Sequence, residues 1–275
     1  MKRLVPPLLM MLAGAGTAAG QEASNTDAFV AAARAGSARY HDQAVAAAEG
    51  YLAVGPDAPG MGRHWVNPEL LLSAVLDPAR PQVLSYITVE GRPVLAGVAY
   101  AVPTHGARDA PSEPAGREAW HFHAGTVAEE SFLPDHHHAG EGPGSDTRVA
   151  VLHVWVWQQN PIGMFEPDNW SLPFARLGFN QPDSAADAGR ALSLATVGAP
   201  FFLAMVREVA HPDSGSLRRV AESLAAHAAT VSAWAADRRG RVLDASDSAW
   251  LAREWAALWR ELRSLAPSDA WSRLQ

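Results

Sequence analysis

Cysteine is absent from the 275 residues of this chain. Its absence excludes disulfide bonds, thiolate metal ligands, a cysteine nucleophile and lipid attachment to cysteine. Basic residues are also few, with 22 Lys and Arg against 29 Asp and Glu and a formal net charge of −7. Because a negative surface repels a phosphate backbone, we expect no nucleic-acid partner.

The apolar run at the N-terminus is too short to cross a membrane, which takes roughly 20 residues. Lys2 and Arg3 precede this run at residues 4–12, and residues 14–20 are mostly small. That order is typical of an export signal, so residues 1–20 are predicted to be a signal peptide. We expect a periplasmic or secreted protein with no stable membrane span after the signal is removed. A retained N-terminal anchor is the alternative.

Residues 149–157 have the clearest strand pattern in the chain. His153, Trp155 and their alternate neighbours share one face, and both faces are largely apolar. Apolar residues on both faces are typical of a strand in the middle of a sheet. Residues 82–89 and 93–102 alternate in the same way on either side of Glu90-Gly91, which predicts a β-hairpin.

From about residue 182 the apolar spacing changes from two residues to about 3.6, the period of a helix. Four helices are expected, over residues 184–197, 200–210, 216–238 and 246–265. We therefore predict an α+β fold with a small, mainly antiparallel sheet and flanking helices over residues 21–180. A helical C-terminal unit is predicted over residues 181–275.

Histidines supply the main candidate site. His121 and His123 stand two residues apart in a short strand pattern, so their side chains point the same way and can share one metal ion. His153 lies in the main predicted strand. We expect His64 at a sharp corner of a glycine- and proline-rich loop over residues 54–66. Imidazole ligands suit zinc, copper, nickel or iron, so the predicted cofactor is a divalent transition metal. The alternative is that each histidine is a hydrogen-bonded core residue.

Aromatic and acidic residues extend this candidate site. Tyr100, Trp155 and Trp157 are candidates for an aromatic platform, although the same residues fill cores. Asp168 and Glu166 follow the main strand in a loop and are candidates for acid–base chemistry. The predicted ligand-binding set is His64, Trp65, Tyr100, His153, Trp155 and Asp168.

A second group of histidines, His136, His137 and His138, lies in a glycine-rich segment beside Asp135. Such a run can bind or deliver a divalent ion. We expect a solvated loop instead, since polar, glycine-rich segments usually run over the surface.

Two segments resemble a family of exported, uncharacterised bacterial proteins. They are Gly60–Pro68 and His153–Phe165, and the second contains His-Val-Trp-x-Trp-x-x-Asn-Pro-x-Gly-Met-Phe. Asp77–Pro81 and Tyr40-His41-Asp42 also fit, so the resemblance covers roughly residues 38–170. The resemblance implies an exported protein with one α+β unit and carries no established reaction. Within the matching motifs, His64 and His153 are the residues that the resemblance implies as the candidate site.

Three hypotheses about function follow. The first is a non-enzymatic exported domain that binds a metal ion or small ligand near His64 and His153. The second is a metal-dependent enzyme with His64, His121, His123 and His153 as ligands and Asp168 or Glu166 as general base. The third is a structural protein that binds no ligand and whose histidines are packing residues of the core. Such a protein could assemble as a homo-oligomer.

Overall fold

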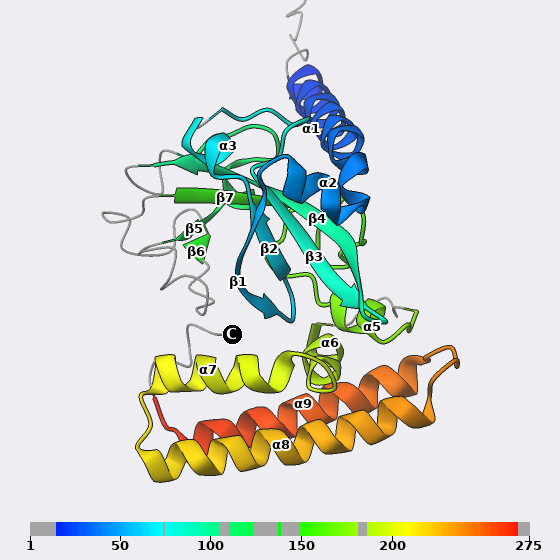
Figure 1. The fold of residues 1–275 in the computed structure, drawn as a ribbon, viewed down its shortest axis with the longest axis vertical. Coiled ribbons are helices and arrows are strands. Elements are labelled where there is room, and N and C mark those ends of the chain that lie inside the picture. Colours follow the sequence, from blue (N-terminus) through cyan, green and yellow to red (C-terminus); the bar gives the residue numbers. More distant parts are fainter. Residues whose placement is uncertain are drawn as a thin grey trace, which may run out of the picture.

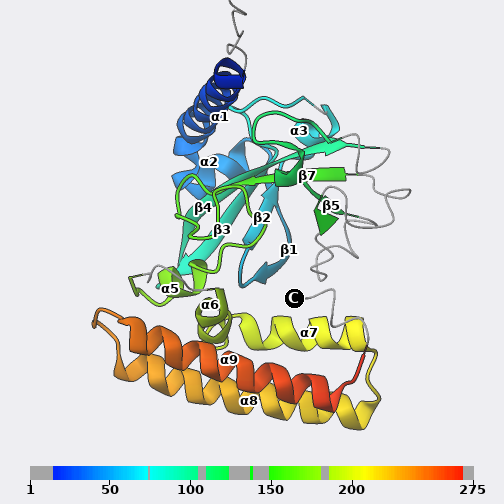
Figure 2. The same ribbon diagram turned by 180° about the vertical axis from the view of Figure 1, so that it is seen from behind.

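The computed structural model describes residues 15–73, 75–104, 110–123, 137–138, 149–180 and 186–268. It confirms the predicted α+β fold class. An antiparallel sheet with flanking helices forms the upper part of the molecule in Figure 1, and a layer of helices from the C-terminal third lies below it. Figure 2 shows the same two parts from behind.

The sheet is antiparallel throughout its described pairs, in the order β1-β2-β3-β4-β7-β5-β6. The strands are β1 (Leu52–Ala58), β2 (Gly62–Val66), β3 (Val83–Val89), β4 (Arg92–Pro103), β5 (His121–His123), β6 (His137–His138) and β7 (Val149–Val154). The predicted main strand is β7, and it lies between β4 and β5 as its apolar faces indicate. The sheet is strongly twisted, since β7 runs at a large angle to β3 in Figure 1.

The predicted hairpin is confirmed as β3 and β4. Glu90 and Gly91 both have positive φ, 49° and 77°, which is the two-residue turn that suits the twist of a hairpin. A β-bulge interrupts the pairing, because Ser85 faces Gly97 while Tyr86 faces Leu95. An extra residue on one strand bends the sheet locally.

The prediction of a loop over residues 54–66 is wrong. This segment forms β1 and β2, and His64 lies within β2, paired with Val54 on one side and Ser85 on the other. The glycines and prolines lower its strand propensity, but pairing with the edge of β3 outweighs that local preference. The expected loop at the second histidine group is also wrong in part, since His137 and His138 pair with β5. His136 lies outside the described residues.

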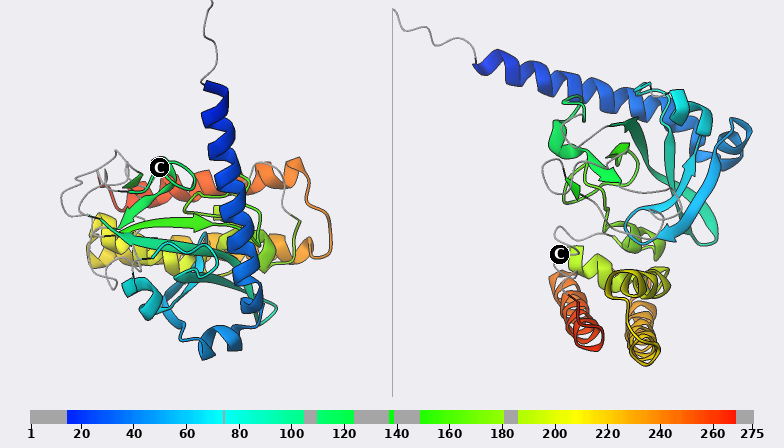
Figure 3. Two further views of the ribbon diagram at one scale, coloured as in Figure 1. Left: turned by 90° about the horizontal axis from the view of Figure 1, so that it is seen from above. Right: turned by 90° about the vertical axis from the view of Figure 1, so that its left-hand side faces the viewer.

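The N-terminal helices cover one face of the sheet. They are α1 (Ala15–Ser37), the 3₁₀ helix η1 (Ala38–His41) and α2 (Gln43–Ala48). Phe29 of α1 packs edge-on against Tyr100 with 5.0 Å between ring centroids. Tyr40 and Tyr51 are buried in the same core, which includes Leu152 of β7. The N-terminal part of α1 projects away from the sheet (Figure 3). Its first residues belong to the segment predicted as an export signal.

The helical region has a separate core. It comprises α6 (Ala186–Ser193), α7 (Gly198–Ala210), α8 (Ser214–Asp237) and α9 (Ala245–Leu265), with bounds close to those predicted. Trp234 of α8 stacks on Trp250 of α9 at 5.1 Å, and Phe202 of α7 contacts Trp255 at 4.9 Å. Short helices elsewhere are α3 (Pro68–Ser73), η3 (Arg117–Ala119) and α5 (Leu172–Arg176).

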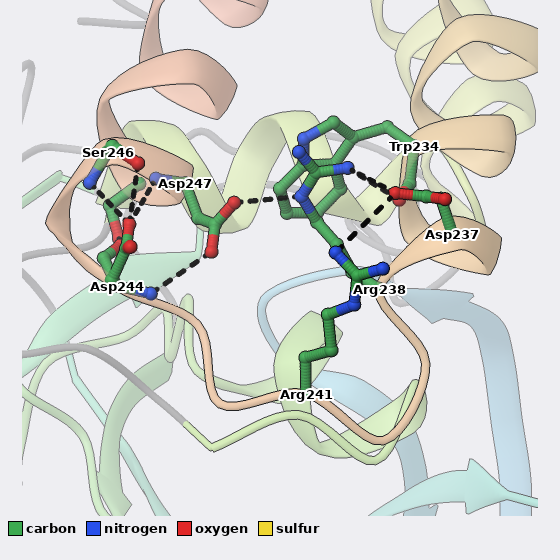
Figure 4. Close-up of polar contacts among 8 residues, drawn as sticks. Trp234, Asp237, Arg238, Arg241, Asp244, Ser246 and Asp247 are labelled. Atoms are coloured by element: carbon green, nitrogen blue, oxygen red, sulfur yellow. Dashed lines mark hydrogen bonds and ion pairs between the residues drawn. The ribbon is translucent and has the colours of Figure 1, made fainter.

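A polar cluster fixes the turn between α8 and α9 (Figure 4). The guanidinium of Arg238 lies 4.5 Å from the ring centroid of Trp234, and its Nε donates to Asp247 Oδ1 at 2.8 Å. Asp244 accepts from the backbone amides of Ser246 and Asp247, while Asp247 accepts from the amide of Asp244. This reciprocal capping box determines where α9 begins.

Among the described helices, no single one is both long and apolar enough to cross a membrane. The bent pair Ala186–Ser193 and Gly198–Glu208 meets the length and composition criteria only when the two helices are taken together.

Candidate functional site

The structure brings His64 and His153 together from strands that are not neighbours. Their ring centroids are 5.6 Å apart, although β3 and β4 lie between β2 and β7. In a flat sheet the backbones of β2 and β7 would be about 14 Å apart, at roughly 4.8 Å per strand. The two side chains therefore lean toward each other on the concave side of a curved sheet.

We call this side of the sheet the histidine face. The name covers His64, Ser85, Gly97, Ala99, His121, His153 and Trp155, and Val83 and Val151 point to the same side. Register places the strand residues there, because residues directly opposite one another in neighbouring strands point to the same side. Trp155, which follows β7, is placed there by its ring contact with His153. His64 faces Ser85, Ser85 faces Gly97, and Ala99 faces His153.

Small residues form the floor between the two imidazoles. Ser85, Gly97 and Ala99 carry little or no side chain, which leaves room for the rings above them. Trp155 closes one side: a Cβ added to Gly97 would lie 2.8 Å from the Trp155 ring. Trp155 also stacks on His153 at 5.5 Å and donates through Nε1 to the carbonyl of Glu166 at 2.7 Å.

A third imidazole continues the row. The ring of His121 lies 5.0 Å from that of His153, and His121 is fully buried. The backbone of His123 pairs with Val149, one step further along β7. The side chain of His123 lies outside the part of the chain that the structure describes. The three imidazoles thus form a row with His153 in the middle.

Burial keeps His64 uncharged at neutral pH. Desolvation lowers its pKa from 6.5 to about 4, and the charge of Asp57 opposes this only in part. Asp57 itself binds Arg176 through two hydrogen bonds, at 2.8 and 2.5 Å. This ion pair links α5 to β1. Because its carboxylate oxygens are bound to Arg176, Asp57 is not a free metal ligand.

Two polar atoms on the histidine face lack a partner among the described residues. His64 Nε2 and Ser85 Oγ are both buried and make no hydrogen bond there. Buried polar groups are normally satisfied, so such atoms call for a specific explanation. Within the same described residues, no three His, Asp or Glu side chains already form a metal-holding group. The face therefore offers imidazole pairs rather than a complete coordination set.

Asp168 lies in the loop after β7, beside the turn that joins β1 to β2. A Cβ added to Gly60 would lie 2.7 Å from its Oδ1. Desolvation raises the pKa of Asp168 to about 6, and the charge of Arg190 opposes this. Hydrogen bonds from Asn160 to the Asp168 carbonyl and from the Asn169 amide to Gly60 hold the loop in place. The charged residue that affects the pKa of Asp168 is thus Arg190 of α6, whereas the one that affects the pKa of His64 is Asp57 of β1.

The structure separates Trp65, Tyr100 and Trp157 from the histidine face. Trp65 faces Leu84 and contacts Tyr86 at 5.9 Å on the opposite side of the sheet. Tyr100 is fully buried there and donates to the carbonyl of Pro78 at 2.6 Å.

Trp157 also packs against the core on that opposite side, where its Nε1 donates to Ser37 Oγ at 3.1 Å. Tyr100, Trp155 and Trp157 therefore do not share one platform, and each packs in a core, which is the other interpretation of these residues. Strand alternation sends Trp65 and Tyr100 away from their neighbours His64 and Ala99.

Ser85 and the Asp57–Arg176 pair were not among the residues that the sequence identified. Ser85 stands between apolar residues in the predicted hairpin. A polar residue on a covered face of a sheet could itself have indicated a functional position. No local pattern marks Asp57 and Arg176 as partners, because their contact depends on how α5 meets β1.

Comparisons of the chain with protein-family models, with curated proteins and with solved structures find no match. The resemblance carried by Gly60–Pro68 and His153–Phe165 therefore stays a prediction, as does the export signal.

Proposed function

We propose that this chain is an exported protein that binds a divalent transition metal ion on its histidine face. One observation carries the proposal: His64 and His153, from strands with two others between them, place their rings 5.6 Å apart. Two imidazoles that share one ion at Zn–N distances near 2.0–2.1 Å have ring centres about 5 Å apart. The observed separation of 5.6 Å is close to that value.

The burial of the site supports an ion over an organic ligand. His64 Nε2 and Ser85 Oγ have almost no contact with solvent. An organic molecule would have to displace part of the fold to reach them, whereas an ion needs little more space than a water molecule. Because the pKa of His64 is about 4, its ring has a free lone pair at neutral pH and releases no proton on binding.

The test uses protein purified without a polyhistidine tag, stripped with a chelator and titrated with Zn²⁺ or Co²⁺. We expect one ion per chain by elemental analysis. His64→Ala and His153→Ala should each weaken binding by more than about 100-fold, because loss of an indirect partner alone costs 10–100-fold. His211→Asn is the matched control, since His211 is exposed at the end of α7 in the helical region.

Three outcomes would contradict the proposal. Wild-type protein that takes up no stoichiometric ion would remove it. Loss of the ion only when His137 and His138 are replaced with threonine would move the site to β6. A chain without ions that forms a defined oligomer, and whose thermal stability no ion changes, would favour a structural role.

A metal-dependent enzyme is the second candidate, and Asp168 is the observation that favours it. A carboxyl group with a pKa of about 6 is suited to act as a general base near neutral pH. In that case Asp168→Asn would abolish turnover of activated ester or phosphoester substrates by the metal-loaded protein and leave metal affinity unchanged. Glu166 is the alternative base, and its carbonyl already accepts the indole N–H of Trp155.

A further inference from the structure

Ser85 occupies the centre of the histidine face. It lies on β3, directly opposite His64 of β2 on one side and Gly97 of β4 on the other. Its side chain has no exposed area, and its Oγ makes no hydrogen bond within the described residues. A hydroxyl group in that position has both its donor and its acceptor capacity unused.

The two histidines converge across the strand that carries this residue. His64 reaches from β2 and His153 reaches from β7, so their rings approach each other over β3 and β4. Gly97 and Ala99 contribute no polar side-chain atom to that floor. Ser85 is therefore the one polar side chain of the histidine face that lies between the two strands bearing these imidazoles.

We infer that Ser85 Oγ is an oxygen ligand of the ion that we propose for His64 and His153. This inference rests on the proposed function and completes three protein ligands, two imidazole nitrogens and one hydroxyl oxygen. Such a mixed set suits borderline divalent ions such as Zn²⁺ and Co²⁺ more than soft monovalent ions, which prefer sulfur. It also gives the unpaired hydroxyl and the unpaired His64 Nε2 a common explanation.

The main alternative is that a buried water molecule satisfies Ser85. Single water molecules often fill such positions in protein interiors. A water molecule would explain the hydroxyl equally well but would give Ser85 no effect on the spectrum of a bound metal.

The absence of cysteine from the chain allows a direct test with Ser85→Cys. The probe is Co²⁺ added to chelator-stripped protein. A thiol at position 85 that binds the ion as thiolate should produce a near-ultraviolet sulfur-to-cobalt charge-transfer band, which wild type cannot show. Ser223→Cys is the matched control, because Ser223 is also buried with an unpartnered hydroxyl among the described residues but lies on α8. It should bind Co²⁺ like wild type and show no such band.

A second variant keeps the test decisive if Ser85→Cys does not fold. Ser85→Ala removes one oxygen from a buried site, and it should raise the dissociation constant for Co²⁺ about tenfold with an unchanged circular dichroism spectrum. Wild-type binding with no band in folded Ser85→Cys, or with unchanged affinity in Ser85→Ala, would overturn the role of Ser85 alone. Failure of wild type to bind Co²⁺ would instead overturn the proposed function.

Discussion

Two partly buried groups, His64 and Asp168, are expected to change the stability of this protein in opposite directions between pH 4 and 6.5. Burial shifts the pKa of each toward the uncharged form, which lowers the value for the histidine and raises it for the carboxyl group. Because the shifts are opposite, the wild-type protein hides both effects, and single substitutions should reveal them.

The contribution of His64 is lost as the pH falls. Its pKa is about 4 in the folded protein and 6.5 for an ordinary histidine. Above pH 6.5 the ring is neutral in both states, so it contributes no pH dependence. Between pH 6.5 and 4 the unfolded chain gains a proton that the folded protein does not, so the free energy of unfolding decreases. At about 1.4 kcal/mol per pKa unit, roughly 3 kcal/mol is lost by pH 4.

The contribution of Asp168 is lost as the pH rises. Its pKa is about 6 in the folded protein and 3.8 for an ordinary aspartate. Below pH 3.8 the carboxyl group is neutral in both states. Between pH 3.8 and 6 the unfolded chain releases a proton that the folded protein keeps, so the free energy of unfolding decreases with rising pH. This shift also amounts to about 3 kcal/mol by pH 6.

Urea unfolding of metal-free protein at pH 7 and pH 4.5 measures both effects. On going from pH 7 to 4.5, the free energy of unfolding of His64→Gln should rise by about 2–3 kcal/mol relative to that of wild type. The variant has no histidine at this position, so it does not lose the stability that wild type loses there. Over the same change of pH, the free energy of unfolding of Asp168→Asn should fall by about 2 kcal/mol relative to that of wild type. The variant has no carboxyl group at this position, so it does not gain the stability that wild type gains there. Comparing each variant with itself at two pH values removes the pH-independent cost of the substitution.

The reasoning would be refuted if His64→Gln and wild type showed the same pH dependence. That result would mean that the folded protein accepts a charge on His64 as readily as the unfolded chain does. A shift of the same sign in both variants would equally contradict the assignment, since burial must act oppositely on an acid and a base.

Four further substitutions, three of them around the site and one at the start of α9, are tested by urea unfolding. Arg176→Met should cost about 3 kcal/mol because Asp57 loses its bidentate partner, and Asp57→Asn should then cost less in that background than alone. Gly97→Ala should cost about 1–3 kcal/mol and change the near-ultraviolet circular dichroism, because the new methyl group meets Trp155; an unchanged spectrum would contradict this contact. Asp244→Ala should lower the urea midpoint through loss of the cap of α9, and an unchanged midpoint would contradict a stabilising role for this cap.

The sequence was sufficient to predict those helices and strands whose residue pattern is long and depends only on neighbouring residues. The hairpin of β3 and β4 has alternating arms and a turn pair, Glu90-Gly91, that both favour the same structure. The four C-terminal helices have apolar stripes, so their bounds could be predicted closely. In these segments each residue's local preference agrees with its tertiary environment.

The strands β1 and β2 could not be predicted because their local preferences point to a loop. Gly55 and Gly62 adopt positive φ, which favours turns over strands. Their strand structure comes from pairing with β3, which is information about a neighbour and not about the segment itself. Missing β2 had a direct consequence for the site, because it hid the alternation that sends His64 and Trp65 to opposite faces.

The convergence of His64 and His153 depends on three features that act together. The order of the strands puts two others between β2 and β7, so a flat sheet would keep the rings apart. The bulge between Ser85 and Tyr86 accompanies the curvature that turns the histidine face inward. Small residues at the floor, of which Gly97 also accommodates Trp155, leave the space that the rings occupy. Enlarging that floor residue should therefore separate the imidazoles and weaken the proposed ion site, even though no ligand atom is changed.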